Sequence, residues 1–386
     1  MDASGIRKVF DLAAKLRDPI NLSIGQPDFP VPEAVKHAAI EAIRSDRNGY
    51  TVTQGIPALH EAIWNEVRTE AGWEGPSNDL AALVTSGTSG GLLLACMALL
   101  DPGDEAIVPD PYFVLYPQLG PLTGGRVVTC DTYPDFRLTA ERVEPLITPR
   151  TKLVIVCSPS NPCGVVNTSA ELRDLVDLCQ RRGILLVADE IYDKFIFSES
   201  AEIGPGGGGH AAGHAAGHAP SAARFSEDVL LVRGFGKSYG CTGWRLGYVV
   251  GPKAIVHEMA KLQQYTYVCA PSIAQHGAVA AFGVDLGPIV RNYERRRDLV
   301  METLGAVTEV PRPGGAFYAF VRVPPHLGLS ATEFVERAIE RRVLIIPGKV
   351  FSHRDTHFRL SFAAPEEKLA EGLEILVDLM KDGGGK

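Results

Sequence analysis

Two reactive side chains in this sequence follow apolar segments that are typical of buried strands. Asp189 comes directly after residues 184–188, and Lys237 lies among glycines shortly after residues 229–233. A carboxylate at the end of a buried strand is costly unless it meets a cation or several hydrogen-bond donors. A lysine beside a pocket can lose its proton and act as a nucleophile. Each residue also has an ordinary explanation, because Asp189 could cap the next helix and most lysines are exposed.

Tyr192 and Asn161 add hydrogen-bonding groups near the same region. Tyr192 follows Asp189 by three residues, and Asn161 comes shortly after the apolar segment 153–157 with a proline on each side. The prolines and the glycine that follows make this turn stiff and aim the amide, although the same residues also form a plain turn. In open α/β sheets, ligands bind at the carboxyl ends of strands.

A glycine-rich turn and two arginines indicate places where anions can bind. The turn contains Gly87, Thr88 and Ser89 and lies between a predicted strand and a predicted helix, where free backbone N–H groups favour phosphate. Such turns are common, but Arg245 could supply a matching bidentate cation. Arg359 lies inside an apolar strand, where an unpaired charge is costly. Its partner is either a carboxylate ligand or a structural salt bridge.

The conjunction of these groups fits one cofactor, pyridoxal 5′-phosphate. This cofactor needs a lysine for its Schiff base and an acid for its pyridine nitrogen. The acid keeps that nitrogen protonated, so that the ring accepts the electrons left when a Cα–H proton departs. The phosphate turn, the arginine, the phenol and the amide match the rest of the molecule.

The elements that must position these side chains alternate between short strands and helices. The segments 91–100 and 171–182 predict helices, and the second follows Thr168 and Ser169, a good N-cap pair. Several strands are apolar throughout, as in a sheet that is covered on both faces. We therefore expect an α/β fold with a mostly parallel central sheet. The predicted strands are 82–85, 106–109, 126–130, 153–157, 184–188, 229–233 and 246–250.

Beyond residue 270 the pattern predicts a smaller α+β unit, which the N-terminal segment joins. We expect a large cofactor-binding domain over 45–285, and a small domain formed by 1–44 with 286–386. A low-complexity insert, 204–220, carries His210, His214 and His218. Their four-residue spacing would place these histidines on one face of a helix, where their side chains could bind a metal. The glycines between them, however, weaken any helix there. We expect a flexible surface loop and no metal site. The small unit is predicted from a helix over 289–304, strands over 316–323, 343–346 and 358–362, and a closing helix over 366–380.

Composition excludes several classes of protein. The 386 residues carry 38 Lys+Arg and 46 Asp+Glu, a net charge of −8, which argues against nucleic-acid binding. Seven scattered cysteines without a C-x-x-C pair are typical of reduced thiols, so we expect a soluble, cytoplasmic protein. The uncharged run 80–100 is long enough to span a bilayer. The polar glycine turn in its middle instead predicts a buried strand and a buried helix, and no membrane partner.

The chain resembles the class I/II aminotransferases, the aspartate aminotransferase-like branch of fold-type I pyridoxal phosphate enzymes. The resemblance runs from about Leu22 to the C-terminal helix. Its most specific motifs are Gly25-Gln-Pro-Asp-Phe-Pro30, Tyr50…Gly55, Asn161-Pro-Cys-Gly164, Asp189-Glu-Ile-Tyr192, Lys237…Thr242-Gly-Trp-Arg245 and Phe358-Arg-Leu-Ser361.

The resemblance implies a role for each residue around the cofactor ring. Lys237 looks like the Schiff-base lysine and the base that shuttles the proton. Asp189 would pair with the pyridine nitrogen, and Tyr192 and Asn161 would bond the ring hydroxyl. Phe113 would stack on the ring face.

The resemblance also implies the phosphate, substrate and subunit contacts. Arg359 would grip the substrate carboxylate, helped by Asn161 and the backbone at Gly25. Tyr50 would reach the phosphate of the neighbouring subunit, which implies a homodimer with shared active sites. The phosphate itself would be held by Gly87, Thr88, Ser89 and Arg245.

The sequence departs from the family pattern in three places. The stretch before the lysine commonly has two serines, but here it is Gly234-Phe-Gly236, so a phosphate contact must fall on the backbone or Thr88. The insert lengthens the spacing between Asp189 and Lys237. No residue stands out as a partner for a side-chain carboxylate, which weakens an expectation of aspartate specificity.

We therefore expect a homodimeric transaminase that moves the amino group of an L-amino acid to a 2-oxo acid by a ping-pong mechanism. The closest alternative keeps the cofactor but cleaves cysteine conjugates such as cystathionine as a β-lyase. The segment 234–240 is close to a nicotinamide-binding turn, but a strand follows where that fingerprint needs a helix. A cofactor-sensing regulator would need a DNA-binding segment before Leu22, and we expect none there.

Overall fold

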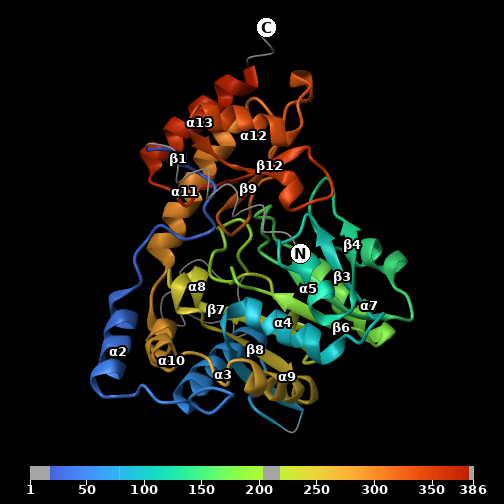
Figure 1. The fold of residues 1–386 in the computed structure, drawn as a ribbon, viewed down its shortest axis with the longest axis vertical. Helices are drawn as coiled ribbons and strands as arrows, with labels where there is room; N and C mark the ends of the chain where they lie inside the picture. The colour runs from blue at the N-terminus through green and yellow to red at the C-terminus, as the bar shows by residue number, and fades with distance from the viewer. Residues whose placement is uncertain (1–17, 78, 203–217, 382–386) are drawn as a thin grey trace.

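A seven-stranded sheet forms the centre of the larger part of the molecule (Figure 1). The computed structural model describes residues 18–77, 79–202 and 218–381. The strand order across the sheet is β2-β8-β7-β6-β5-β3-β4. The strands are β2 (Leu80–Thr85), β3 (Glu105–Asp110), β4 (Arg126–Asp131), β5 (Thr151–Cys157), β6 (Leu185–Asp189), β7 (Val229–Gly234) and β8 (Gly247–Pro252).

The sheet is mostly parallel, as predicted. Strands β3 to β7 pair in parallel, and β8 runs antiparallel to both of its neighbours. The seven predicted strands are confirmed to within two residues at each end. Because parallel strands point their carboxyl ends toward one edge, the residues that follow β5, β6 and β7 come together there.

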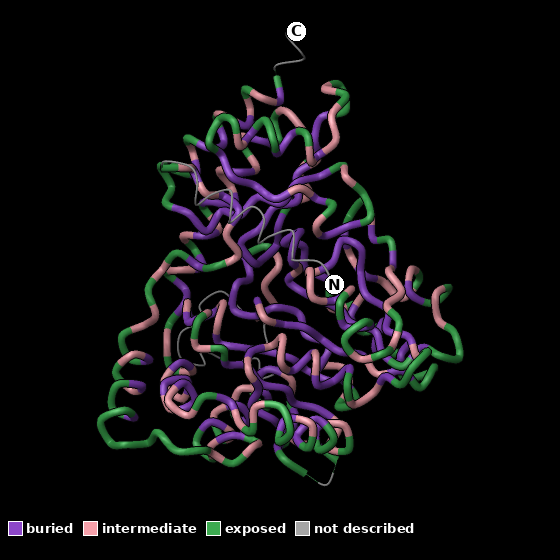
Figure 2. Tube along the Cα trace, viewed as in Figure 1, coloured by how far each residue is buried: buried purple, intermediate pink, exposed green. Residues whose placement is uncertain are grey.

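Two apolar cores lie on the two faces of this sheet. Along β5, Val154 and Val156 belong to one core, whereas Leu153 and Ile155 belong to the other. Alternating side chains along a strand point to opposite faces, so a strand buried on both sides needs apolar residues at every position. Figure 2 shows that burial follows the sheets, whereas exposed residues lie mainly on the outer helices and loops.

Helices cover both faces of the sheet. Helices α4 (Gly87–Leu99) and α9 (Lys253–Thr266) pack on each other and on β8, and α7 (Ser169–Arg182) packs on β6. Thr168, one of the two predicted N-cap residues, caps α7 and forms a capping box with Glu171. The other helices of this part are α3 (Pro57–Ala71), α5 (Tyr116–Thr123), α6 (Ala140–Val143), α8 (Phe235–Ser238) and α10 (Ser272–Val279).

A second, smaller group of elements lies above the large sheet in Figure 1. Its sheet has the order β11-β12-β9 and is antiparallel. The N-terminal strand β1 (Ile20–Asn21) pairs with β10 (Val343–Leu344), whereas α2 (Glu33–Arg44) packs on α10. The division into domains at 44 and 286 stays a prediction. The remaining elements are β9 (Tyr318–Arg322), β11 (Ile346–Pro347), β12 (His357–Ser361), α11 (Gly287–Leu304), α12 (Ala331–Glu340) and α13 (Glu366–Lys381).

The uncharged run 80–100 folds as strand β2, a turn at Ser86 and helix α4. In the described part of the chain, no single helix has the length and apolar composition to cross a bilayer. One bent pair, Ser272–Gly283 with Gly287–Leu304, meets those two criteria together. Helix α4 begins at Gly87, four residues earlier than predicted, because small residues can form the first turn and leave its N–H groups uncovered.

Two of the three histidines of the insert, His210 and His214, lie outside the described residues. His218 lies within them, and its Nδ1 atom is 3.1 Å from Oε1 of Glu70. Among the described residues, no cluster of side chains suits a metal ion.

Gly164 ends the turn that carries Asn161, and no side chain fits there. Its φ is +69°, and a Cβ atom would lie 2.4 Å from the carbonyl oxygen of Tyr318. We expect Gly164→Ala to lower the free energy of unfolding by roughly 2–4 kcal/mol, since it combines backbone strain with a collision. Chemical denaturation measures the change.

Gly183→Ala is a matched control for this prediction. Gly183 has a φ of +64°, but a Cβ atom there would meet no other atom within 4 Å. Its substitution should therefore cost only about 1 kcal/mol of backbone strain. An equal decrease in the free energy of unfolding of the two variants would show that the collision at Gly164 does not affect stability.

Candidate active site

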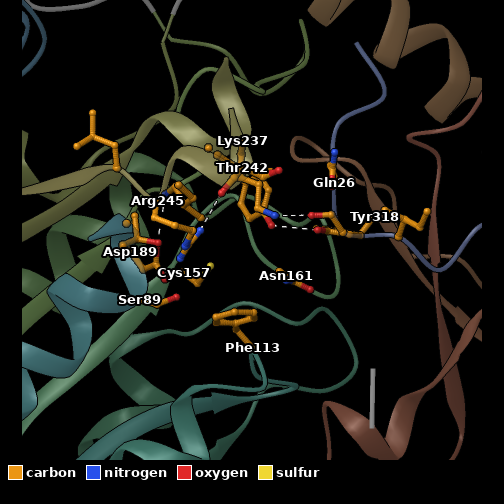
Figure 3. A pocket seen from close by; sticks show the side chains of 18 of the residues that line it. Gln26, Ser89, Phe113, Cys157, Asn161, Asp189, Lys237, Thr242, Arg245 and Tyr318 are labelled. Carbon is orange, nitrogen blue, oxygen red and sulfur yellow. Dashed lines mark hydrogen bonds between the residues drawn. The ribbon is translucent and has the colours of Figure 1, made fainter. Parts of the chain in front are cut away.

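A cavity of about 440 Å³ opens at the carboxyl ends of β5, β6 and β7. Side chains from both sheets converge on it (Figure 3). Of the site residues predicted from the sequence, eleven line it: Gly25, Gly87, Thr88, Ser89, Phe113, Asn161, Asp189, Tyr192, Lys237, Arg245 and Arg359.

Asp189 is buried at the end of β6 and forms no ion pair with any described residue. The Tyr116 hydroxyl donates to its Oδ2 atom at 2.7 Å, and the backbone N–H of Ile191 donates to Oδ1 at 3.3 Å. Burial raises the pKa of Asp189 to about 6, although both hydrogen bonds act in the opposite direction. A cationic ligand atom at this place would compensate the buried charge.

Lys237 lies on the short helix α8 and faces the cavity. Its Nζ atom donates to the carbonyl oxygen of Gly25. Burial lowers the pKa of Lys237 to about 8, and the charges of Arg359 and Arg245 contribute to this lowering. About a tenth of this amine is therefore uncharged at pH 7, far more than for an ordinary lysine, and the uncharged form is the one that acts as a nucleophile or a base.

A buried ionic cluster contacts the helix that carries Lys237. The Ser238 hydroxyl donates to Oδ1 of Asp193 at 3.3 Å. Asp193 lies 3.5 Å from Nζ of Lys194, which in turn donates to Glu70 at 2.6 Å. Arg233 of β7 also contacts Asp193, at 3.6 Å. Helix α8 is thereby tied to the sheet next to the reactive amine.

The first turn of α4 and Arg245 form a cradle for an anion. Gly87 has a φ of +69°, and a Cβ atom there would lie 2.9 Å from Nη2 of Arg245. Only glycine therefore allows the guanidinium group to approach the helix N-terminus so closely. Arg245 forms no ion pair within the part of the chain that the structure describes, and its Nη1 donates to the carbonyl of Thr242 at 3.1 Å.

The missing serine at position 234 has a structural explanation. A Cβ atom on Gly234 would lie 3.0 Å from Cδ1 of Ile191 and 3.1 Å from Cγ2 of Thr88. Thr88 and Ile191 therefore fill the space that a serine side chain would take. The aliphatic hydroxyl groups of the cavity lining belong to Thr88, Ser89 and Thr242.

Arg359 is buried on β12 without an ion-pair partner among residues 18–381 that are described. It donates to Oδ1 of Asn161 at 3.1 Å and to the carbonyl of Ser23 at 2.8 Å, while its Nε atom has no partner. Its guanidinium carbon lies 4.5 Å from the ring centre of Tyr318. Burial lowers the pKa of Arg359. The cavity thus holds a guanidinium group that lacks an anion.

These groups fit pyridoxal phosphate. The unpaired carboxylate of Asp189 suits a protonated ring nitrogen, and the cradle of Gly87 and Arg245 suits a phosphate. Lys237 lines the same cavity with a lowered pKa. The donor set therefore matches each end of the cofactor.

Tyr50 does not line the cavity, and 88% of its surface is exposed. Sequence reasoning missed two cavity neighbours, Tyr116 and Tyr318. Tyr116 follows the predicted Phe113 by three residues and begins α5, and the centres of the two rings lie 5.8 Å apart, so this short sequence spacing was a usable signal. Tyr318 pairs in register with Ser361, two residues from Arg359, which only the pairing of β9 with β12 reveals.

Comparison with known proteins agrees with this geometry. The family model described as aminotransferase class I and II matches residues 17–376. The probable aspartate aminotransferase of Methanocaldococcus jannaschii is 32% identical over 98% of this chain and 97% of its own. The aromatic-amino-acid aminotransferase 2 of Thermococcus litoralis is 31% identical over 99% of this chain and 97% of its own.

Solved structures give the same result. The aspartate aminotransferase of Thermus thermophilus with maleate has a TM-score of 0.88 and 35% identity, and the match covers 98% of this chain and 97% of that one. The chain belongs to the class I and II aminotransferases. It is a transaminase that depends on pyridoxal phosphate.

Substituting Asp189 should stabilise the protein without its cofactor. The folded-state pKa of about 6 lies above the unfolded value of about 3.9, so the ionised group destabilises the fold at higher pH. We expect Asp189→Asn to raise the free energy of unfolding of the apoenzyme by roughly 1–3 kcal/mol at pH 8, and the gain to vanish below about pH 4. Denaturant titrations at the two pH values measure this difference.

Asp177→Asn provides the control, because Asp177 is exposed on α7 and should show no such dependence on pH. An Asp189→Asn apoenzyme that is less stable than wild type at pH 8 would contradict the unpaired state of this carboxylate.

Proposed function

We propose that this transaminase forms its cofactor linkage at Lys237 and binds its amino and oxo acid substrates at Arg359. The observation that carries the proposal is that one cavity holds a buried carboxylate and a buried guanidinium without ionic partners among the described residues, together with a lysine of lowered pKa. A protonated ring nitrogen of the cofactor would pair with the carboxylate of Asp189, and the carboxylate of the substrate would pair with the guanidinium of Arg359.

Proton transfer falls to Lys237. When bound, pyridoxal phosphate supplies an aromatic ring that accepts the electron pair released from the substrate Cα–H bond. The Lys237 amine would take the proton from the substrate Cα atom as a general base and later give it back as a general acid. Its lowered pKa keeps enough of the amine uncharged for this step.

Asp189, Asn161 and Tyr192 tune the ring. Asp189 would hold a proton on the ring nitrogen of the cofactor and so keep the ring electron-poor. Asn161 accepts from Arg359 through Oδ1, which leaves its amide nitrogen to donate to the ring hydroxyl. Tyr192 would donate its phenolic proton to the same oxygen. Phe113, which lines the cavity, would stack on the ring face.

Arg359 receives the substrate carboxylate through its planar, bidentate donor group, with Asn161 and the backbone at Gly25 beside it. Two half-reactions then share one site: an amino acid leaves as an oxo acid, and a second oxo acid takes the nitrogen.

Relatives named for aspartate and for aromatic amino acids differ in side-chain class. A panel of amino donors against 2-oxoglutarate and pyruvate identifies the preferred pair.

We further propose a homodimer in the cytoplasm in which Tyr50 reaches the partner subunit's phosphate site. Large apolar side chains that are exposed in the single chain support a subunit interface: Tyr50 is 88%, Val52 62% and Tyr265 90% exposed. Such residues are enriched at subunit interfaces. The seven cysteines, all free thiols, support a reducing compartment.

Lys237→Ala tests the assignment of the reactive amine. We expect the variant to lose the visible absorbance of the bound cofactor and its transaminase turnover, because no other described lysine lines the cavity. Its circular dichroism should match that of wild type. Absorbance spectra and a coupled oxo acid assay measure both properties.

Lys261→Ala is the matched control, since Lys261 is an exposed lysine on α9. It should keep both properties. A Lys237→Ala enzyme that transaminates at the wild-type rate would contradict the proposed function.

Mixing two variants tests the shared site. Each Lys237→Ala subunit keeps Tyr50, and each Tyr50→Ala subunit keeps Lys237. If Tyr50 serves the partner, remixed hybrids regain intact sites, up to about a quarter of the total for a twofold-symmetric dimer. Activity after remixing measures this gain. A mixture no more active than the average of its two parents would contradict a shared site.

A further inference from the structure

Tyr318 connects the two ends of the active site. It is fully buried on β9 and lines the cavity, where it is labelled in Figure 3. Its hydroxyl oxygen lies 3.1 Å from the hydroxyl oxygen of Tyr192. Its ring lies under the Arg359 guanidinium, 4.5 Å from the guanidinium carbon to the ring centre. One side chain therefore contacts the phenol at the ring hydroxyl and the arginine for the substrate carboxylate.

The backbone fixes Tyr318 in this position. Strand β9 pairs with β12 so that Tyr318 faces Ser361 and Phe320 faces Arg359, which makes Tyr318 and Arg359 diagonal neighbours. On the other side, a Cβ atom on Gly25 would lie 2.9 Å from the Tyr318 hydroxyl. The hydroxyl is thus confined between the Gly25 backbone and Tyr192.

The hydrogen-bond capacity of Tyr192 defines what the Tyr318 hydroxyl does. A tyrosine has one hydroxyl proton. Once Tyr192 donates that proton to the ring hydroxyl of the cofactor, its own oxygen is left to accept, and the Tyr318 hydroxyl is the group within reach. Hydrogen bonds linked in a chain polarise and strengthen one another, most of all in a buried site.

The ring of Tyr318 has a separate effect on Arg359. Arg359 has no anion beside it among the described residues, and two aromatic faces, those of Tyr318 and Phe351, flank its guanidinium at 4.5 Å and 4.7 Å. The negative face of an aromatic ring attracts a cation. These rings hold the guanidinium in place and leave its edge available to a carboxylate.

We propose that Tyr318 is a positioning residue for transamination. Its hydroxyl donates to Tyr192 and strengthens the hydrogen bond from Tyr192 to the ring hydroxyl, and its ring holds Arg359 for the substrate carboxylate. This inference rests on the contact between Tyr192 and the cofactor that is part of the proposed function.

Tyr318→Phe separates the hydroxyl from the ring. Hydrogen bonds to the ring hydroxyl oxygen stabilise its anionic form, and they lower the pH at which the nitrogen joined to Lys237 loses its proton. Removing the Tyr318 hydroxyl should raise the pH midpoint of the visible absorbance change of the holoenzyme by about 0.5 unit, as expected for one weakened hydrogen bond. The KM for amino acids should stay within about twofold because the ring remains.

Tyr318→Leu removes the ring as well. Arg359 then loses one of its two aromatic faces, and we expect the KM for the amino donor to rise about fivefold or more, in the range of a buried cation–π contact. Tyr133→Phe is the matched control, since the Tyr133 hydroxyl bonds Ser352 at 3.0 Å but lies away from the cavity. It should leave the midpoint and the KM unchanged.

A double-mutant cycle tests the route through Tyr192. Tyr192→Phe should raise the midpoint by more than Tyr318→Phe, and the double variant should shift no further than Tyr192→Phe alone. A Tyr318→Phe midpoint equal to that of wild type, or an additive shift in the double variant, would overturn the inference. An unchanged midpoint in Tyr192→Phe would instead contradict the cofactor contact on which it rests, while the Lys237 assignment would stand.

Discussion

The site depends on two buried groups of opposite charge, neither of which forms an ion pair with any described residue. Asp189 and Arg359 each lie in a low-dielectric interior without an ionic partner among the described residues, a state that is unfavourable for both. A ligand assembly that brings a cation to one end and a carboxylate to the other removes both penalties. Lys237 lies in the same cavity, and the charge of Arg359 helps to lower its pKa. The unpaired charge of Arg359 therefore favours binding of a carboxylate and also lowers the pKa of the reactive amine.

Two sheets have to meet correctly for these charges to face one ligand. Asp189 ends a strand of the seven-stranded sheet and Lys237 lies on the short helix that follows another, whereas Arg359 and Tyr318 belong to the three-stranded sheet. Asn161 joins the two parts because it accepts a hydrogen bond from Arg359. Glycines allow close approaches within the site, at Gly87 against Arg245 and at Gly25 against Tyr318. Rigid strand ends suit such a site because small displacements weaken catalysis strongly.

Much of this site could be predicted from the sequence because its main groups directly follow apolar strands. Asp189 and Lys237 are recognisable in that way, and the apolar strands themselves define the sheet. Tyr318 was not predictable, because its role depends on the register between β9 and β12. The sequence also could not show that Thr88 and Ile191 fill the space beside Gly234, because this requires the packing of separate elements. The part assigned to Tyr50 requires a second chain.

A crystal structure of the holoenzyme would test the central claim most directly. The unpaired charges predict electron density for the cofactor that is continuous with Nζ of Lys237, with the ring nitrogen at hydrogen-bond distance from Asp189 and the phosphate between Gly87 and Arg245. Density attached to another residue, or a ring nitrogen that points away from Asp189, would contradict it.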